Sequence, residues 1–230
     1  MAERFPAAVL LDLDGTLLDS APDFFATLAV MAERRGWEAP ADALIRPVVS
    51  KGSRAMLAAA FPQLEQDQRE ALVDEFLDTY QDLIGQHARL FDGVEPMLQA
   101  LEQAGCRWGI VTNKPEYLAQ LILPQHGWQQ RCAVLVGGDT LAEKKPHPLP
   151  LLHAAQAIAV PAGQCVYVGD DQRDIQAAQA AGMPSVAALW GYRLADDVPQ
   201  DWGADCLHES AATLSQPAAW PQVIHESEMS

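Results

Sequence analysis

The sequence predicts an α/β protein, a Rossmann-like parallel sheet flanked by helices, with a helical cap domain inserted near its beginning. Two observations predict it. Over most of the chain short apolar runs alternate with amphipathic segments, as in parallel βαβ units. Between residue 22 and about residue 86, by contrast, every patterned segment is helical. We therefore expect a core domain of residues 1–19 and 88–230 and a cap domain of residues 20–87.

The first strand is expected at residues 7–11, a continuously apolar run that suits a strand buried on both faces. Asp12 and Asp14 follow it, and Gly15 lets the chain turn away. Alternate residues of a strand point to the same side, and open α/β sheets bind ligands at the carboxyl ends of their strands. Two carboxylates would therefore face one crevice. Their repulsion would be relieved by a divalent cation such as Mg²⁺, which prefers oxygen ligands.

The remaining elements follow from periodicity and from glycine or proline at segment ends. Ser20 is expected to be the N-cap of the first helix, with Asp23 in a variant of the capping box. The segments expected to be helical are residues 22–35, 41–48, 53–61, 66–85, 94–105, 115–126, 148–158 and 173–181. The later strands are expected at residues 108–111, 133–136, 165–168 and 185–189, with a short edge strand at 205–207.

Composition narrows the classes of function. A chain of 230 residues is long enough for one domain with an insert, and its net charge of −16 argues against nucleic acid or an anionic membrane as partner. No apolar run is long enough to span a bilayer, and the N-terminus lacks the pattern of a signal peptide. The four cysteines are scattered and fit free thiols in a reducing cytoplasm. We expect a cytoplasmic monomer or homodimer.

Polar residues of a particular kind follow four of the predicted strands. Because parallel strands end at the same edge of a sheet, these residues should converge on one crevice. They are Asp12 and Asp14; Thr112, Asn113 and Lys114; Lys144 and Lys145; and Asp170, Asp171 and Asp174.

Four motifs in this set resemble, in order, those of the haloacid dehalogenase-like (HAD) phosphatases. The chain from about residue 7 to residue 190 is most similar to the phosphoglycolate phosphatase branch, which includes N-acetylmuramic acid 6-phosphate phosphatases. The motifs are Asp12-x-Asp14-Gly15-Thr16-Leu17-x-Asp19-Ser20, Val111-Thr112-Asn113-Lys114, Lys145-Pro146-His147-Pro148 and Gly169-Asp170-x-x-x-Asp174.

The resemblance implies a Mg²⁺-dependent phosphomonoesterase that works through an aspartyl-phosphate on Asp12. Asp14 would act as general acid and then general base, and its backbone carbonyl would reach the metal. Asp170 would be a metal ligand together with Asp12, and Asp174 a ligand or a partner of one. In a slow reaction such as phosphate ester hydrolysis, positioning and charge neutralisation dominate catalysis.

The same resemblance implies roles around the phosphate. Thr112 and the amide of Asn113 would bind phosphoryl oxygens, and Lys145 would place a cation beside nucleophile and phosphate. In the cap, the basic residues Lys51 and Arg54 stand before and in a helix start, which suits the binding of a substrate carboxylate.

Several of these residues have a second interpretation. Thr112 could cap the next helix, and Asp171 could cap the helix that follows it instead of contacting the metal. Asp19 is expected to make turn contacts. Trp190 and Tyr192 could line the entrance or simply pack. The aromatic residues of the cap, Trp37, Phe61 and Tyr80, are expected in its core.

Three functions fit the motifs. The first is a phosphatase that acts on a small phosphorylated metabolite. Phosphoglycolate is its default substrate, and N-acetylmuramic acid 6-phosphate is the rival. Residues 48–54 and 90–93 look closer to the phosphatases of N-acetylmuramic acid 6-phosphate. A β-phosphoglucomutase-like phosphosugar mutase would hand the phosphoryl group to a sugar hydroxyl instead of to water. A receiver-like phospho-acceptor pairs similar residues, but its acceptor lies on a later strand and it carries no cap.

Overall fold

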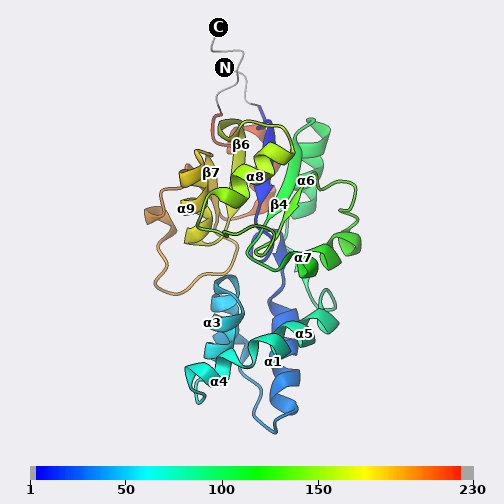
Figure 1. Ribbon diagram of the computed structural model, residues 1–230. Coiled ribbons are helices and arrows are strands. Elements are labelled where there is room, and N and C mark those ends of the chain that lie inside the picture. The colour runs from blue at the N-terminus through cyan, green and yellow to red at the C-terminus, as the bar shows by residue number, and fades with distance from the viewer. Residues whose placement is uncertain (1–3, 224–230) are drawn as a thin grey trace.

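The core of the molecule is a six-stranded parallel sheet with strand order β5-β4-β1-β6-β7-β8 (Figure 1). This is a computed structural model, and it describes residues 4–223. Its strands are β1 (Ala8–Leu11), β4 (Arg107–Val111), β5 (Leu135–Val136), β6 (Cys165–Gly169), β7 (Ser185–Ala188) and β8 (Cys206–His208). The predicted parallel α/β fold is confirmed, and the expected edge strand is β8.

Helices cover both faces of the sheet. They are α6 (Val94–Gln103), α7 (Glu116–Ile122), α8 (Leu149–Ala157) and α9 (Gln172–Ala181). Leu10 and Leu11 of β1 are fully buried on opposite faces, as alternation in a strand requires. Leu11 packs in a cluster with α6 and α7, and Leu10 in a cluster with α8 and α9. The central strand is thus apolar throughout because both of its faces are covered.

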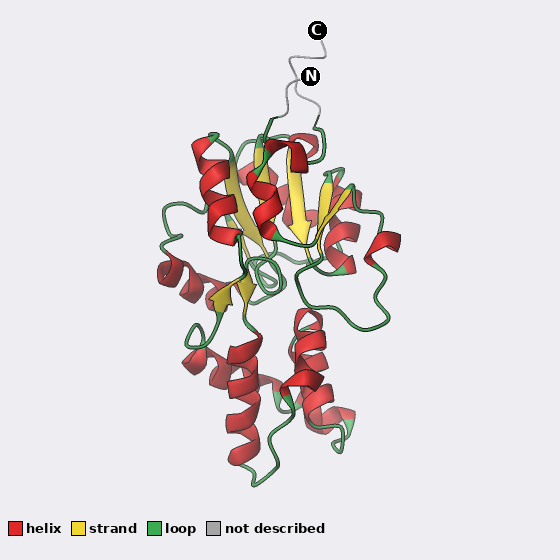
Figure 2. Cartoon of the chain, turned by 180° about the vertical axis from the view of Figure 1, so that it is seen from behind, coloured by secondary structure: helices red, strands yellow, loops and turns green. Residues whose placement is uncertain are grey.

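The cap consists of helices that Figure 2 shows beyond one end of the sheet. Its elements are α1 (Ala21–Glu33), α2 (Asp42–Ile45), the 3₁₀ helix Arg46–Lys51, α3 (Ser53–Ala60), α4 (Gln66–Glu70) and α5 (Val73–Leu83). Most of them share an apolar cluster, in which Phe24, Phe76 and Tyr80 stack. Leu118 of α7 and Tyr192 also belong to this cluster, so the small core of the cap packs against the core domain.

Three expected helices are shorter or divided. The helix expected at residues 66–85 is two helices, because α4 is entirely polar and buries nothing that would hold it in line with α5. The helix expected at residues 41–48 gives way to a 3₁₀ turn at Arg46, where Pro47 supplies no backbone N–H. Near Pro124, likewise, α7 changes to the 3₁₀ helix Leu123–His126.

The chain crosses between core and cap through two adjacent segments. Strands β2 (Leu18–Asp19) and β3 (Arg89–Leu90), which the sequence did not predict, pair in antiparallel fashion at the crossing. Ser20 does occupy the N-cap position of α1, but its side chain makes no capping hydrogen bond. The expected capping box is therefore wrong. The limits expected for the two domains lie beside this crossing, and they stay a prediction.

The Asp23 carboxylate binds the second crossing segment instead. It accepts backbone N–H bonds from Gly85, His87 and Ala88 at 2.6, 2.7 and 3.1 Å. Asp23 is fully buried, so these bonds replace the water that the carboxylate loses. One side chain thus ties the start of the cap to its end. Within residues 4–223 no helix is long and apolar enough to cross a membrane.

Candidate functional site

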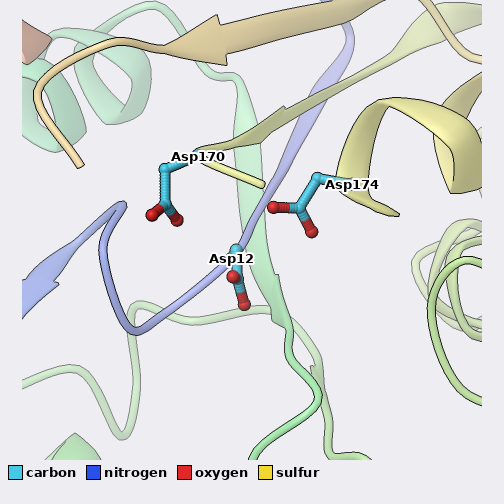
Figure 3. Close-up of side chains that lie close together, drawn as sticks. All are labelled: Asp12, Asp170 and Asp174. Atoms are coloured by element: carbon cyan, nitrogen blue, oxygen red, sulfur yellow. The ribbon is translucent and has the colours of Figure 1, made fainter. Parts of the chain in front are cut away.

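Three carboxylates meet at the carboxyl edge of the sheet (Figure 3). Asp12 follows β1, Asp170 follows β6, and Asp174 stands in the first turn of α9. One oxygen from each lies within 4.8 Å of the others, and all three residues are buried. The fold therefore brings residues from both ends of the chain to one point, as the parallel sheet predicts.

Lys145 lies among these carboxylates. Its Nζ is 2.9 Å from Asp12 Oδ1 and 2.7 Å from Asp174 Oδ1, and it donates to the Tyr167 hydroxyl at 2.8 Å. Burial acts to lower the pKa of Lys145, but the charges of the two aspartates outweigh it and raise that pKa. The Tyr167 hydroxyl donates in turn to the Val111 carbonyl at 2.7 Å. The ammonium is thus a fixed positive charge beside Asp12.

The donor set around Asp170 fits a divalent cation. Burial and the charges of Asp12 and Asp174 raise the pKa of Asp170 well above its usual range, although Ser50 and Tyr192 donate hydrogen bonds to it. With Asp14 the site holds four carboxylates against the two ammonium groups of Lys114 and Lys145. A divalent cation would cancel the excess negative charge, and clustered carboxylate oxygens suit Mg²⁺.

Gly15 makes room for this cluster. Its φ is +90°, and a Cβ on it would lie 2.2 Å from Asp170 Oδ2. The left-handed conformation and the close approach both require glycine. This explains in physical terms why a glycine follows Asp14.

Asp14 takes part in a different contact, with Lys114. The Lys114 ammonium lies 3.1 and 3.0 Å from the two Asp14 oxygens and donates to the Tyr80 hydroxyl at 2.6 Å. It also lies over the rings of Phe24 and Tyr80, 5.0 and 4.3 Å from their centroids. Lys114 belongs to the second motif, but the sequence analysis assigned it no role. Its place in that motif was the one feature of the sequence that pointed to the site.

The two residues before Lys114 shape the same loop. Thr112 is buried, and its Oγ1 accepts the backbone N–H of Lys114 at 3.2 Å. Asn113 donates from Nδ2 to the Lys145 carbonyl at 3.0 Å, so the loop after β4 holds the loop that carries Lys145. Both residues line the cavity described below.

The end of the 3₁₀ helix Arg46–Lys51 in the cap lies against the acidic cluster. Ser50 Oγ donates to Asp170 at 2.8 Å, and the Ser50 carbonyl accepts from Arg173. Lys51 pairs with Asp171 at 2.9 Å. Arg54, which we expected beside the substrate, binds Glu70 at 2.7 Å through Nε and is largely exposed. The structure therefore places Lys51 against the core and pairs Arg54 within the cap. Ser50 is a site residue that the sequence analysis missed.

The structure shows the contacts of Asp171 and Asp19, two residues whose roles the sequence left open. Asp171 is the N-cap of α9 and accepts the Arg173 N–H at 3.0 Å. Burial acts to raise the pKa of Asp171, but Arg173 and Lys51 outweigh it and lower that pKa to about 2. Asp19 accepts hydrogen bonds from Arg46 and from the Tyr192 hydroxyl, both far from it in the sequence. The turn or helix-start contacts expected of Asp19 stay a prediction.

The remaining aromatic residues mostly pack. Trp190 donates to the Thr16 carbonyl at 2.9 Å, and Tyr192 is buried with its hydroxyl at the first crossing segment. Trp37 and Phe61 pack edge to face in the cap. Tyr80 is fully buried in the cap core, yet its hydroxyl reaches Lys114.

A cavity of about 550 Å³ lies between cap and core. Asp12 and Asp14 of the first motif open onto it, together with the loop after β4 and residues of the cap. Its lining includes Asp12, Asp14, Lys51, Tyr80, Thr112 and Lys114.

A capped parallel sheet with a buried carboxylate, a lysine beside it and an acidic cluster that could hold a cation would suit phosphoryl transfer. Comparison with known proteins makes the class specific. The family model described as haloacid dehalogenase-like hydrolase matches residues 9–188. The chain belongs to the haloacid dehalogenase-like hydrolases, and within them it is a phosphatase.

The relatives agree with this family. A phosphoglycolate phosphatase of Xanthomonas campestris is 72% identical over 95% of this chain and 99% of its own. An N-acetylmuramic acid 6-phosphate phosphatase of Pseudomonas putida is 44% identical over 87% of this chain and 90% of its own. A crystal structure from Haemophilus somnus, described as a predicted phosphoglycolate phosphatase, superposes with a TM-score of 0.81 at 26% identity, covering 93% of this chain and 97% of its own.

Proposed function

We propose that this enzyme hydrolyses a small phosphate monoester that carries a carboxylate, through an aspartyl-phosphate on Asp12. The observation that carries the proposal is the position of the Asp12 carboxylate, which is buried, paired with Lys145 and open to the cavity. A buried carboxylate held next to a cation suits attack on phosphorus.

The chemistry divides between two carboxyl groups. An Asp12 oxygen attacks phosphorus, the bond from phosphorus to the alcohol oxygen breaks, and protonated Asp14 gives its proton to that oxygen. Water then attacks the phosphoryl group on Asp12, and Asp14 takes a proton from this water. Phosphate leaves and Asp12 is regenerated. The cap excludes other water while the intermediate exists.

The neighbouring residues hold the phosphoryl group in place. We propose that Thr112 and the amide of Asn113 donate to its oxygens, while Lys145 offsets its charge. Mg²⁺ is the proposed cation, with Asp12, Asp170, Asp174 and the carbonyl of Asp14 as the groups that would hold it or orient its ligands. When bound, it supplies Lewis-acid neutralisation of the phosphoryl oxygens.

Phosphoglycolate is the first candidate substrate, because the relatives of 72% and 60% identity are named for it. Its carboxylate needs positive charge in a protein of net charge −16. We propose that Lys51 and Arg54, which line the cavity from the cap, attract it. We also propose that the enzyme is cytoplasmic and that it is a monomer or a homodimer.

The cavity volume favours a second candidate, N-acetylmuramic acid 6-phosphate. Cavities of about 300–1,000 Å³ usually enclose drug-sized ligands. The cavity of about 550 Å³ falls within that range and far exceeds what a two-carbon ester fills. The larger ester also carries a carboxylate, and a relative named for it is 44% identical to this chain.

The test measures phosphate release from the two esters side by side, with Mg²⁺ or with EDTA. We expect turnover that requires Mg²⁺ and is lost in Asp12→Asn, which keeps size and packing. Thermal unfolding of the variant should stay close to that of the wild type. Turnover in EDTA would contradict the requirement for a metal. Substantial activity of folded Asp12→Asn would contradict the assignment of Asp12 as nucleophile. Phosphate release from neither ester would contradict the proposed class of substrate.

A further inference from the structure

The Lys114 ammonium lies at the meeting point of cap and core. From the core it contacts the Asp14 carboxylate, and from the cap it contacts the Tyr80 hydroxyl and the faces of Tyr80 and Phe24. Its side chain is 3% exposed, while that of Asp14 is 14% exposed. A cation so placed is held from the cap side even without Asp14, because aromatic faces attract ammonium groups.

Most other cations near the cavity have partners of their own. Lys51 and Arg173 pair with Asp171, and Arg54 pairs with Glu70; neither of these carboxylates lines the cavity. Lys144 lines the cavity but is exposed, so water screens its charge.

Lys145 pairs with Asp12, which lines the cavity, but Lys145 itself does not. Lys114 differs because both it and its partner, Asp14, line the cavity. A ligand in the cavity can therefore reach the Lys114–Asp14 pair directly.

Charge makes this pair the natural receptor for a second anionic group. A substrate carboxylate would enter a cavity floor already occupied by Asp12 and Asp14. At low local dielectric a desolvated cation discriminates strongly between a charged ligand and a neutral one of the same shape. The ammonium has three donors, of which one is directed at Tyr80 and the others face Asp14. Those facing Asp14 can pass to another carboxylate.

We propose that Lys114 binds the carboxylate of the substrate, taking it in exchange for Asp14. Lys114 would then set the preference for acidic phosphate esters, and the exchange would free Asp14 to face the leaving oxygen. The inference rests on the proposed function, since it names the residue that recognises the second anionic group of that substrate.

The test uses two pairs of esters in which an uncharged group replaces the carboxylate. Phosphoglycolate is compared with ethyl phosphate, and N-acetylmuramic acid 6-phosphate with its carboxamide. The second member of each pair is called neutral here because only its phosphate is charged. The readout is the ratio of kcat/KM for the acid to that for its neutral partner. We expect the wild type to favour the acid in at least one pair. Lys114→Met, which keeps length and loses charge, should lower that ratio by about tenfold or more, as for a desolvated charge pair.

The control is Arg107→Met, because Arg107 is an exposed cation at the start of β4 and does not line the cavity. Its ratio should stay within about twofold of the wild type, since screened surface charges contribute little. An unchanged ratio in folded Lys114→Met overturns the inference, as does a ratio lost in Lys51→Met alone.

A second variant keeps the test decisive if Lys114→Met does not fold. Tyr80→Phe removes one hydroxyl and its 2.6 Å bond to Lys114 and keeps the ring. We expect a ratio about tenfold lower, chiefly through the KM of the acid ester, as for the loss of one hydrogen bond to a charged group. Equal loss on acid and neutral esters means a merely structural role and overturns the inference.

The test distinguishes failure of the role inferred for Lys114 from failure of the proposed function. A wild type that hydrolyses neutral esters as well as acidic ones overturns the role of Lys114 and leaves the phosphatase standing. A wild type that releases phosphate from none of the four esters contradicts the proposed function itself.

Discussion

Gly15 shows how closely the carboxylates of this site are packed against the backbone. Alanine there would carry two penalties, a positive φ and a Cβ 2.2 Å from the Asp170 carboxylate. We expect Gly15→Ala to lower kcat/KM by about 100-fold or more, since a displacement of about 1 Å at a reacting centre has that effect. The measurement is phosphate release at saturating Mg²⁺.

Gly36→Ala is the matched control for that variant. Gly36 also has a positive φ, +66°, but nothing lies within 4 Å of the added Cβ. Its expected cost is about 1 kcal/mol of stability with normal turnover. If both variants lose activity equally, strain and not the contact with Asp170 explains the effect.

The site residues that could be predicted were those that directly follow a strand or belong to a family motif. Asp12 and Asp170 were found because parallel strands end together, and the sequence marks those ends. Lys145 stands nine residues after β5, and its role was predicted from its motif. The partners of these residues could not be found in this way. Lys114 meets Tyr80, and Ser50 meets Asp170, only because the cap folds back over the sheet. No local pattern carries that information.

The crossing between core and cap depends on one side chain of α1. Asp23 accepts three backbone N–H groups of the returning segment, in a buried site. We expect Asp23→Ala to lower the free energy of unfolding by about 3 kcal/mol, because three backbone hydrogen bonds are lost at about 1 kcal/mol each. Amide hydrogen exchange at residues 85–88 should become faster.

Asp67→Ala serves as the control. Asp67 stands, like Asp23, in the first turn of a cap helix, but it is exposed. Its removal should change stability by no more than about 0.5 kcal/mol. An equal loss in both variants would attribute the effect to the helix dipole and not to the contact between segments.

Helices and strands were predictable where one face is apolar. The strands of the sheet and α1, α6, α8 and α9 lie close to their expected residues. The errors share a cause. The segment 66–85 reads as one amphipathic helix, yet α4 buries nothing and α5 turns independently. The two-residue strands β2 and β3 pair only because the insert returns to its starting point, which composition does not encode.

The stability of the whole molecule should depend on the metal. Asp170 is buried beside two like charges, which raise its pKa well above the usual range, so a divalent cation that binds the folded state stabilises it. We expect Mg²⁺ at a hundredfold excess over its Kd to add about 2.7 kcal/mol to the free energy of unfolding. Denaturant titration in Mg²⁺ and in EDTA measures the difference.

Asp170→Asn should lose most of this increment, whereas the exposed Asp42→Asn should keep it. An increment of equal size in Asp170→Asn would mean that the cation stabilises the protein from another site. The pair of variants separates specific binding from general screening, because both remove one negative charge.

The paired strands β2 and β3 have a consequence for how such enzymes diversify. Since the insert leaves and re-enters the core at hydrogen-bonded neighbours, another polypeptide can be joined at the same two points without disturbing the sheet. A chimaera that received the corresponding segment of a relative would retain the reaction and acquire the donor's choice of ester. Such a graft must supply the aromatic pair that surrounds Lys114, because that lysine stays behind with the recipient.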